Sequence, residues 1–145
     1  EGRTEQPAAV VVSRSPDFSS AWRFFNQPLQ RWLLAPEPVD QGFDRWFPLA
    51  PTWPERLQAL GAAGIQRLVL LGGAQLSADL LQADCVDALQ LTLVPQLLGG
   101  RFSWLPCTNA PLPAALAQPG AWQSEGAEDL GDGEWLVRYR RIRSG

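Results

Sequence analysis

The sequence predicts an α/β fold in which helices flank a mainly parallel sheet, with an antiparallel hairpin at the C-terminus. Two observations predict the parallel part. An apolar run over Ile65–Leu71 breaks at two glycines and is followed by apolar residues at helical spacing, which is the pattern of a buried strand, a tight turn and an amphipathic helix. A second apolar run covers 88–94. Two strands joined by one helix are nearly always parallel, so this arrangement predicts a βαβ unit.

Strands and helices are also expected to alternate before this unit. Valine-rich residues 8–12 and the apolar residues 31–35 are both too short for helices and are predicted strands. The helix between them is expected to be short, to carry aromatic residues, and to be capped by Asp17, Ser19 or Ser20.

The middle of the chain predicts one more short strand and one more helix. The strand is expected within 44–49, in a segment otherwise rich in aromatic residues and proline. Pro54 occupies the place of a first helical residue, and the helix that it opens should end near Gly61 or Gly64.

The last third predicts the hairpin. Residues 122–128 and 134–142 flank Gly131-Asp132-Gly133, a strong turn signal. The arginines near the C-terminus alternate with apolar residues, which we interpret as the solvent face of the last strand; they are Arg138, Arg140, Arg141 and Arg143.

Composition limits the classes of function. The 145 residues, 46% of them apolar, suit one domain over 1–145, and the lack of any methionine predicts an N-terminally truncated one. The charge of −3 argues against a nucleic-acid partner, and no apolar run is long enough to span a membrane. Because Cys85 and Cys107 form no larger pattern and histidine is absent, we expect neither a disulfide framework nor a metal site, and a cytoplasmic location.

Two small features have both a functional and a structural interpretation. The Gly72-Gly73 turn before a helix favours an anion, most simply a phosphate, although such a turn is more often only a connection. Asp87 stands at a strand start and is better interpreted as a turn or cap residue than as an acid paired with Asp84. The seven tryptophans are interpreted as core and loop packing.

Several motifs in order resemble one known family. They are the Gly64-Ile65 strand start, the Gly72-Gly73 turn, Leu80-Leu81, Val86-Asp87-Ala88-Leu89 and Pro95-Gln96-Leu97-Leu98-Gly99. This combination resembles the C-terminal reductase domain of the bifunctional riboflavin-biosynthesis deaminase/reductase proteins, which has a dihydrofolate-reductase-like fold. The match runs through most of the chain.

The resemblance implies reduction of 5-amino-6-(5-phosphoribosylamino)uracil to its ribitylamino form by NADPH, and a homodimer. By position, the residues facing the cofactor's pyrophosphate would be Gly72, Gly73, Ala74, Gln75 and Leu76. Ser13 and Arg14 stand where this fold meets the 2'-phosphate of NADPH, and a polar exit from a strand is the equally good alternative.

Departures from the family leave a second hypothesis open. Leu71 replaces a frequent Glu or Gln before the glycine turn, and Ala88 replaces the Glu of Val-Asp-Glu-Leu. The family's N-terminal strands, which carry much of the substrate site, are not found in this sequence. We therefore assign no catalytic residue, and a non-catalytic binding or assembly module of the same fold remains the alternative to a reductase.

Overall fold

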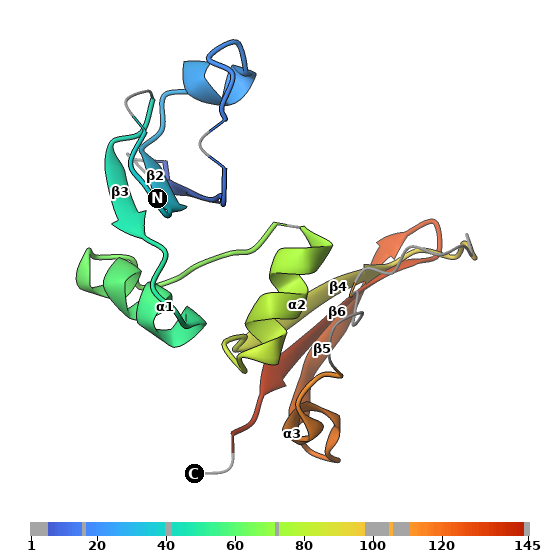
Figure 1. Ribbon diagram of the computed structural model, residues 1–145. Helices are drawn as coiled ribbons and strands as arrows, with labels where there is room; N and C mark the ends of the chain where they lie inside the picture. Colours follow the sequence, from blue (N-terminus) through green and yellow to red (C-terminus); the bar gives the residue numbers. More distant parts are fainter. Residues whose placement is uncertain are drawn as a thin grey trace. The chain divides into compact units, whose positions relative to one another are not determined.

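The computed structural model describes residues 6–15, 17–39, 42–71, 73–97, 105 and 111–143. The chain divides into two compact units, residues 1–68 and residues 69–145. Figure 1 shows the elements of both units.

The first unit is built on a parallel three-stranded sheet. Its strands are β1 (Ala9–Val12), β2 (Arg31–Ala35) and β3 (Arg45–Pro48), in the order β1-β2-β3. Val11 lies opposite Leu33, and Leu33 lies opposite Trp46. All three strands form where the sequence predicts them.

One helix covers a face of this sheet. Helix α1 (Trp53–Ala62) begins with a capping box, in which the Thr52 side chain accepts from the Glu55 amide and the Glu55 carboxylate accepts from the Thr52 amide. Pro54 lies in the first turn, as predicted. Trp32, Leu34 and Leu60 form the buried core between helix and sheet. Leu33 and Ala35 alternate with them and are also buried, so both faces of β2 are covered.

The predicted helix between β1 and β2 is shorter than expected. Only a 3₁₀ turn, η1 (Arg23–Asn26), forms there, and its N-cap is Trp22, with no side-chain cap from Asp17, Ser19 or Ser20. The Ser19 hydroxyl instead accepts from the Ala21 amide at 3.3 Å, a local turn that competes with a helix. The aromatic residues of this segment engage one another in edge-on and stacked ring contacts, which involve Phe18, Trp22, Phe24, Phe25 and Phe43.

The second unit is built on an antiparallel sheet of order β4-β6-β5. Its elements are α2 (Ala74–Gln82), β4 (Ala88–Leu93), the short α3 (Ala114–Ala117), β5 (Trp122–Gly131) and β6 (Glu134–Arg141). The β5–β6 hairpin is confirmed (Figure 1).

The two faces of this sheet differ in polarity. Three cross-strand pairs place apolar or aromatic side chains on one face, namely Leu89 with Tyr139, Leu91 with Val137, and Leu93 with Trp135. On the other face, Arg138 pairs with Glu128 at 2.9 Å and Arg140 pairs with Glu125. Arg138 and Arg140 therefore match the predicted polar face.

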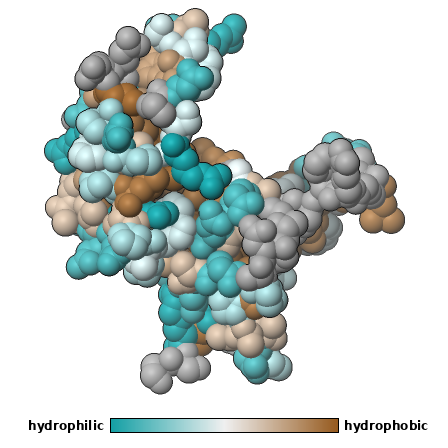
Figure 2. Space-filling view, viewed as in Figure 1, coloured by the Kyte–Doolittle hydropathy of each residue, from teal (hydrophilic) through white to brown (hydrophobic). Residues whose placement is uncertain are grey.

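The predicted strand over Ile65–Leu71 is wrong for this structure. Residues 66–71 have no assigned strand, and Val69 and Leu71 are 77% and 93% exposed. Figure 2 shows hydrophobic residues reaching the molecular surface. An apolar run becomes a strand only when a neighbouring strand takes up its backbone N–H and C=O groups, and no described residue does so here. The predicted βαβ unit is therefore missing among the described residues, and β4 pairs antiparallel with β6.

Among the described residues, no helix is long and apolar enough to cross a membrane.

Candidate functional site

The start of helix α2 carries most of the predicted anion site. Gly73 is the N-cap, in a left-handed conformation with φ of 93°, and its carbonyl accepts the first helical hydrogen bond, from the Ser77 amide at 2.9 Å. The nearest atom to a Cβ built on Gly73 would be Leu76 Cβ, at 3.7 Å. A side chain is therefore disfavoured at Gly73 by backbone conformation rather than by lack of space.

No side chain among the described residues caps the first turn of this helix. The N-cap glycine provides no acceptor, and the first turn has no acidic residue. The amides of Ala74, Gln75 and Leu76 are the ones that an α-helix leaves without an internal partner. The Gln75 side chain does not cap these backbone amides, because its Nε2 atom donates to the Asp79 carboxylate at 2.9 Å. Within the described part of the chain, the turn thus presents N–H groups that no side chain caps and a positive dipole end, which suits a phosphate. Gly72 lies outside the described residues.

Ser13 and Arg14 lie directly after β1. The Ser13 amide extends the sheet by donating to the Leu34 carbonyl at 3.0 Å. The Ser13 hydroxyl donates to the Ser15 carbonyl at 2.6 Å and accepts from the Ser15 amide at 3.2 Å, so it is engaged in a local turn. Arg14 is exposed and forms no ion pair with the residues that the structure describes. Arg14 is therefore the better candidate of the two for an anion.

These predicted residues belong to different units. Ser13 and Arg14 are in the first unit and Gly73–Leu76 in the second. The two positions where the sequence departs from the family pattern are both exposed, Leu71 in the extended segment and Ala88 at the start of β4. Neither side chain offers a polar atom, so neither replaces the hydrogen bonds that Glu or Gln would make.

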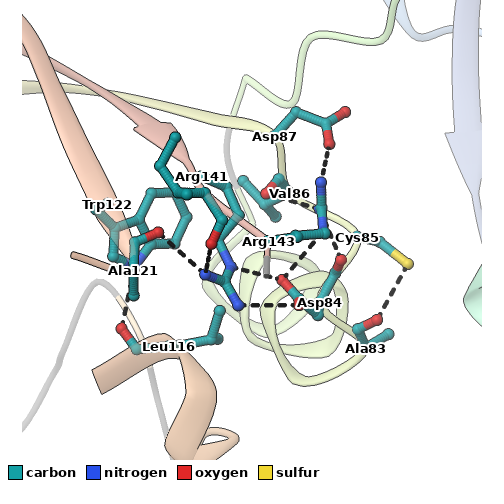
Figure 3. Close-up of polar contacts among 11 residues, drawn as sticks. Ala83, Asp84, Cys85, Val86, Asp87, Leu116, Ala121, Trp122, Arg141 and Arg143 are labelled. Carbon is teal, nitrogen blue, oxygen red and sulfur yellow. Dashed lines mark hydrogen bonds and ion pairs between the residues drawn. The ribbon is translucent and has the colours of Figure 1, made fainter. Parts of the chain in front are cut away.

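A charged cluster near the C-terminus is a feature that the sequence interpretation missed. Arg141 is only 4% exposed, and its Nε and Nη2 atoms donate to the two carboxylate oxygens of Asp84 at 2.9 and 3.1 Å (Figure 3). Arg143 reaches Asp87 at 2.6 Å and the carbonyls of Asp84 and Val86. The interpretation as a solvent face is therefore wrong for Arg141. The sequence does contain a signal for this. Arg140 and Arg141 are neighbours on one strand, and because neighbouring strand residues face opposite sides of a sheet, the two arginines cannot lie on the same face.

This cluster changes the acidity of two neighbouring groups. The hydrogen bond from Arg141, together with its charge and that of Arg143, lowers the pKa of Asp84 despite partial desolvation. Desolvation raises the pKa of the Cys85 thiol, against the opposing charge of Arg143. Asp84 is thus held as a carboxylate and is a poor proton donor, which does not favour a general acid pair of Asp84 and Asp87.

The first unit also has an open groove at the amino ends of its strands, lined in part by Arg31, Asp44 and Arg45. Their polar groups already have partners. The Arg31 side chain donates to the carbonyls of Phe24 and Phe25, and its backbone amide donates to the Asp44 carboxylate. The Arg45 side chain donates to the Ala63 carbonyl. The indole nitrogen of Trp32 has no hydrogen-bond partner among the residues that the structure describes, but it is buried in the core. We assign no ligand to this groove.

The comparisons with known proteins decide the family. A family model described as the RibD C-terminal domain matches residues 1–131. The chain belongs to the RibD C-terminal domain family. The riboflavin biosynthesis protein RibD of Haemophilus influenzae is 30% identical over 133 residues. That match covers 88% of this chain and 35% of the relative, so the chain spans about a third of that protein.

Solved structures resemble the RibD-family chain along most of its length. Acinetobacter baumannii RibD matches with a TM-score of 0.73 at 21% identity, over 92% of this chain and 37% of that one. A pyrimidine reductase-like protein from Corynebacterium diphtheriae matches with a TM-score of 0.74 at 18% identity, over 95% of this chain and 62% of that one. A Thermotoga maritima deaminase and 5-amino-6-(5-phosphoribosylamino)uracil reductase matches with a TM-score of 0.73 at 16% identity, over 95% and 38%. These likenesses confirm the predicted fold class.

Proposed function

We propose that this chain is the cofactor-binding portion of a pyrimidine reductase in riboflavin biosynthesis, acting on 5-amino-6-(5-phosphoribosylamino)uracil with NADPH. The observation that carries the proposal is the open first turn of α2 behind Gly73, in a chain of the RibD C-terminal domain family. The same proposal places the chain in the cytoplasm, where a biosynthetic reductase meets its phosphorylated substrate.

The residues at the two predicted positions suit the charges of NADPH. The first-turn amides of Ala74, Gln75 and Leu76 would hold the pyrophosphate, and the exposed guanidinium of Arg14 would hold the 2'-phosphate, with which it can form a bidentate pair. Bound NADPH supplies a hydride to an imine-like carbon, so the chain's own task is to bind and orient the cofactor. The lack of histidine does not oppose this chemistry.

A titration of the chain with NADPH tests the proposal. Isothermal calorimetry on the parent should show saturable binding, and Gly73→Asp should weaken it at least about tenfold, because the new carboxylate repels the pyrophosphate. Gly131→Asp is the matched control, because Gly131 has φ of 90° against 93° for Gly73 and open space around it, so the charge change is the same and φ is similarly unfavourable for a side chain. NADPH affinity should survive in that control. A folded parent that binds no NADPH would refute cofactor binding.

Leu71 and Ala88 favour one alternative, a non-catalytic module of the same fold. Neither side chain offers the carboxylate or amide that the family resemblance leads us to expect at its position, which lowers the expected affinity for substrate. The discriminating experiment is turnover, measured as NADPH oxidation with the pyrimidine substrate by the intact protein. NADPH binding without turnover would favour the module.

We also propose a homodimer. Each three-stranded sheet of the described residues has edge strands, including β1 with three adjacent valines, and such edges are commonly covered by another chain. Light scattering after size-exclusion chromatography tests this, and a monomer at all concentrations would contradict it.

A further inference from the structure

Helix α2 is held at its C-terminal end by an ion pair from β6. Asp84 follows the helix in a left-handed conformation with φ of 49°, and its amide donates to the Leu81 carbonyl at 2.9 Å. Both of its carboxylate oxygens accept hydrogen bonds from the Arg141 guanidinium (Figure 3). A two-point contact of this kind fixes the direction of the carboxylate as well as its distance.

Arg141 is itself fixed on every side. Its Nη1 atom donates to the carbonyls of Ala121, at 3.0 Å, and Ile142, at 2.5 Å. The guanidinium carbon lies 5.9 Å from the centre of the Trp122 ring, and the Trp122 indole nitrogen donates to the Leu116 carbonyl at 3.1 Å. Every guanidinium nitrogen therefore has a partner. Among the described residues, Arg141 is the one buried charged side chain.

The described residues give the other end of α2 no comparable ion pair or side-chain cap at Gly73. The helix has nine residues. A helix of this length is not stable alone, so its position depends on contacts with the rest of the unit. Among the described residues, the most buried of these contacts are the side chains of Ala78 and Leu81 and the ion pair at Asp84, in the middle and at the C-terminal end. Ala74 and Leu76 in the first turn are only partly buried.

We propose that Arg141, acting through Asp84, is a positioning residue for the N-terminal turn of α2, and this proposal rests on the function proposed above for that turn. The ion pair fixes the helix axis at one end, and the nine-residue helix extends this order to the turn at the other end. The first-turn amides then point in one direction and need not be ordered when the pyrophosphate binds. Preorganised donors of this kind bind an anion more tightly than mobile ones.

Two variants on the same strand test this inference. Arg141→Gln removes the charge and the two-point contact with Asp84. Arg138→Gln is the control, because Arg138 makes an exposed ion pair with Glu128 on the same strand. Hydrogen exchange is read at the Ser77 amide, which bonds to the Gly73 carbonyl, at a temperature where circular dichroism shows both variants folded. NADPH affinity is measured by calorimetry on the same samples.

The expected result for Arg141→Gln is exchange at Ser77 accelerated about tenfold more than exchange at the β5 amides, and NADPH binding about fivefold weaker. Arg138→Gln should change none of the three. Equal acceleration at Ser77 and in β5 would overturn the inference, because a general loss of stability moves both alike. Unchanged exchange at Ser77 would overturn it as well.

Two further outcomes keep the test decisive. If Arg141→Gln does not fold, Arg141→Lys is measured instead. This variant keeps the charge but loses the two-point geometry. Hydrogen exchange should then accelerate by a smaller factor, and again more at Ser77 than at the β5 amides. If the parent binds no NADPH, the proposed function fails, whereas exchange at Ser77 still decides whether Arg141 positions the helix.

Discussion

Replacing Asp84 with asparagine should destabilise the second unit in a way that depends on pH. The change keeps the shape of the side chain and removes the charge that faces Arg141. Removing one partner of a buried ion pair costs roughly 3 to 5 kcal/mol. The Asp84 side chain is 33% exposed and asparagine still accepts one hydrogen bond, so we expect a smaller loss, about 2 kcal/mol, in the free energy of unfolding near neutral pH.

The sign of the pH dependence follows from the pKa of Asp84. The hydrogen bond from Arg141 lowers that pKa below the ordinary value of about 3.9 in an unfolded chain. A carboxyl shifted in this direction contributes stability above its unfolded pKa and loses it as the pH falls through its folded pKa. The free energy of unfolding of the parent should therefore exceed that of Asp84→Asn by the full amount of about 2 kcal/mol at neutral pH. This difference between the two proteins should shrink below about pH 4.

Urea unfolding at about pH 7, 5 and 3 measures this difference. The NMR signals of β4 and β6 amides are followed, so that only the second unit is reported. Glu128→Gln is the control, because its exposed pair with Arg138 should contribute less than about 1 kcal/mol. A difference between the parent and Asp84→Asn that is as large at pH 3 as at pH 7 would show that the Asp84 charge is not its source.

Two other perturbations test the packing of each unit. Leu34→Ala should lower the free energy of unfolding of the first unit by about 3 kcal/mol, because Leu34 is 0% exposed in the core between β2 and α1 and its truncation leaves a cavity. A loss below about 1 kcal/mol in urea unfolding would contradict the packing of Leu34 in this core. The Cys85 thiol should react with iodoacetamide more slowly than a free cysteine at mildly alkaline pH, since burial raises its pKa, and unfolding in urea should restore the rate. The reaction is followed by mass spectrometry of the peptide that contains Cys85. Equal rates before and after unfolding would contradict the raised pKa.

Local patterns in the sequence were sufficient for most elements. Pro54 and the glycines after it predicted α1, and Gly131-Asp132-Gly133 predicted the β5–β6 hairpin, because helix starts and tight turns depend on a few neighbouring residues. The capping box of Thr52 and Glu55 is likewise a local pattern, formed by residues three positions apart. These elements require no knowledge of distant contacts.

Features that depend on distant partners were not predicted. The run over Ile65–Leu71 has the composition of a buried strand, but composition does not say which strand would pair with it. The Asp84–Arg141 pair joins residues 57 positions apart, and only the fold brings them together. For the candidate site, Gly73 and the open first turn of α2 were recognisable locally, whereas the hydrogen bonds that engage the Ser13 hydroxyl were not.

The exposed segment from Leu68 to Leu71 has a consequence for handling the protein. Four consecutive apolar residues at the surface, with no proline or charge among them, are able to pair with the same segment of another molecule. Arg67 on one side and the glycines on the other limit the length of such pairing, since charges and glycine disfavour extended aggregates. Self-association should therefore increase with protein concentration chiefly through this segment, and Val69→Lys is the change most suited to reduce it.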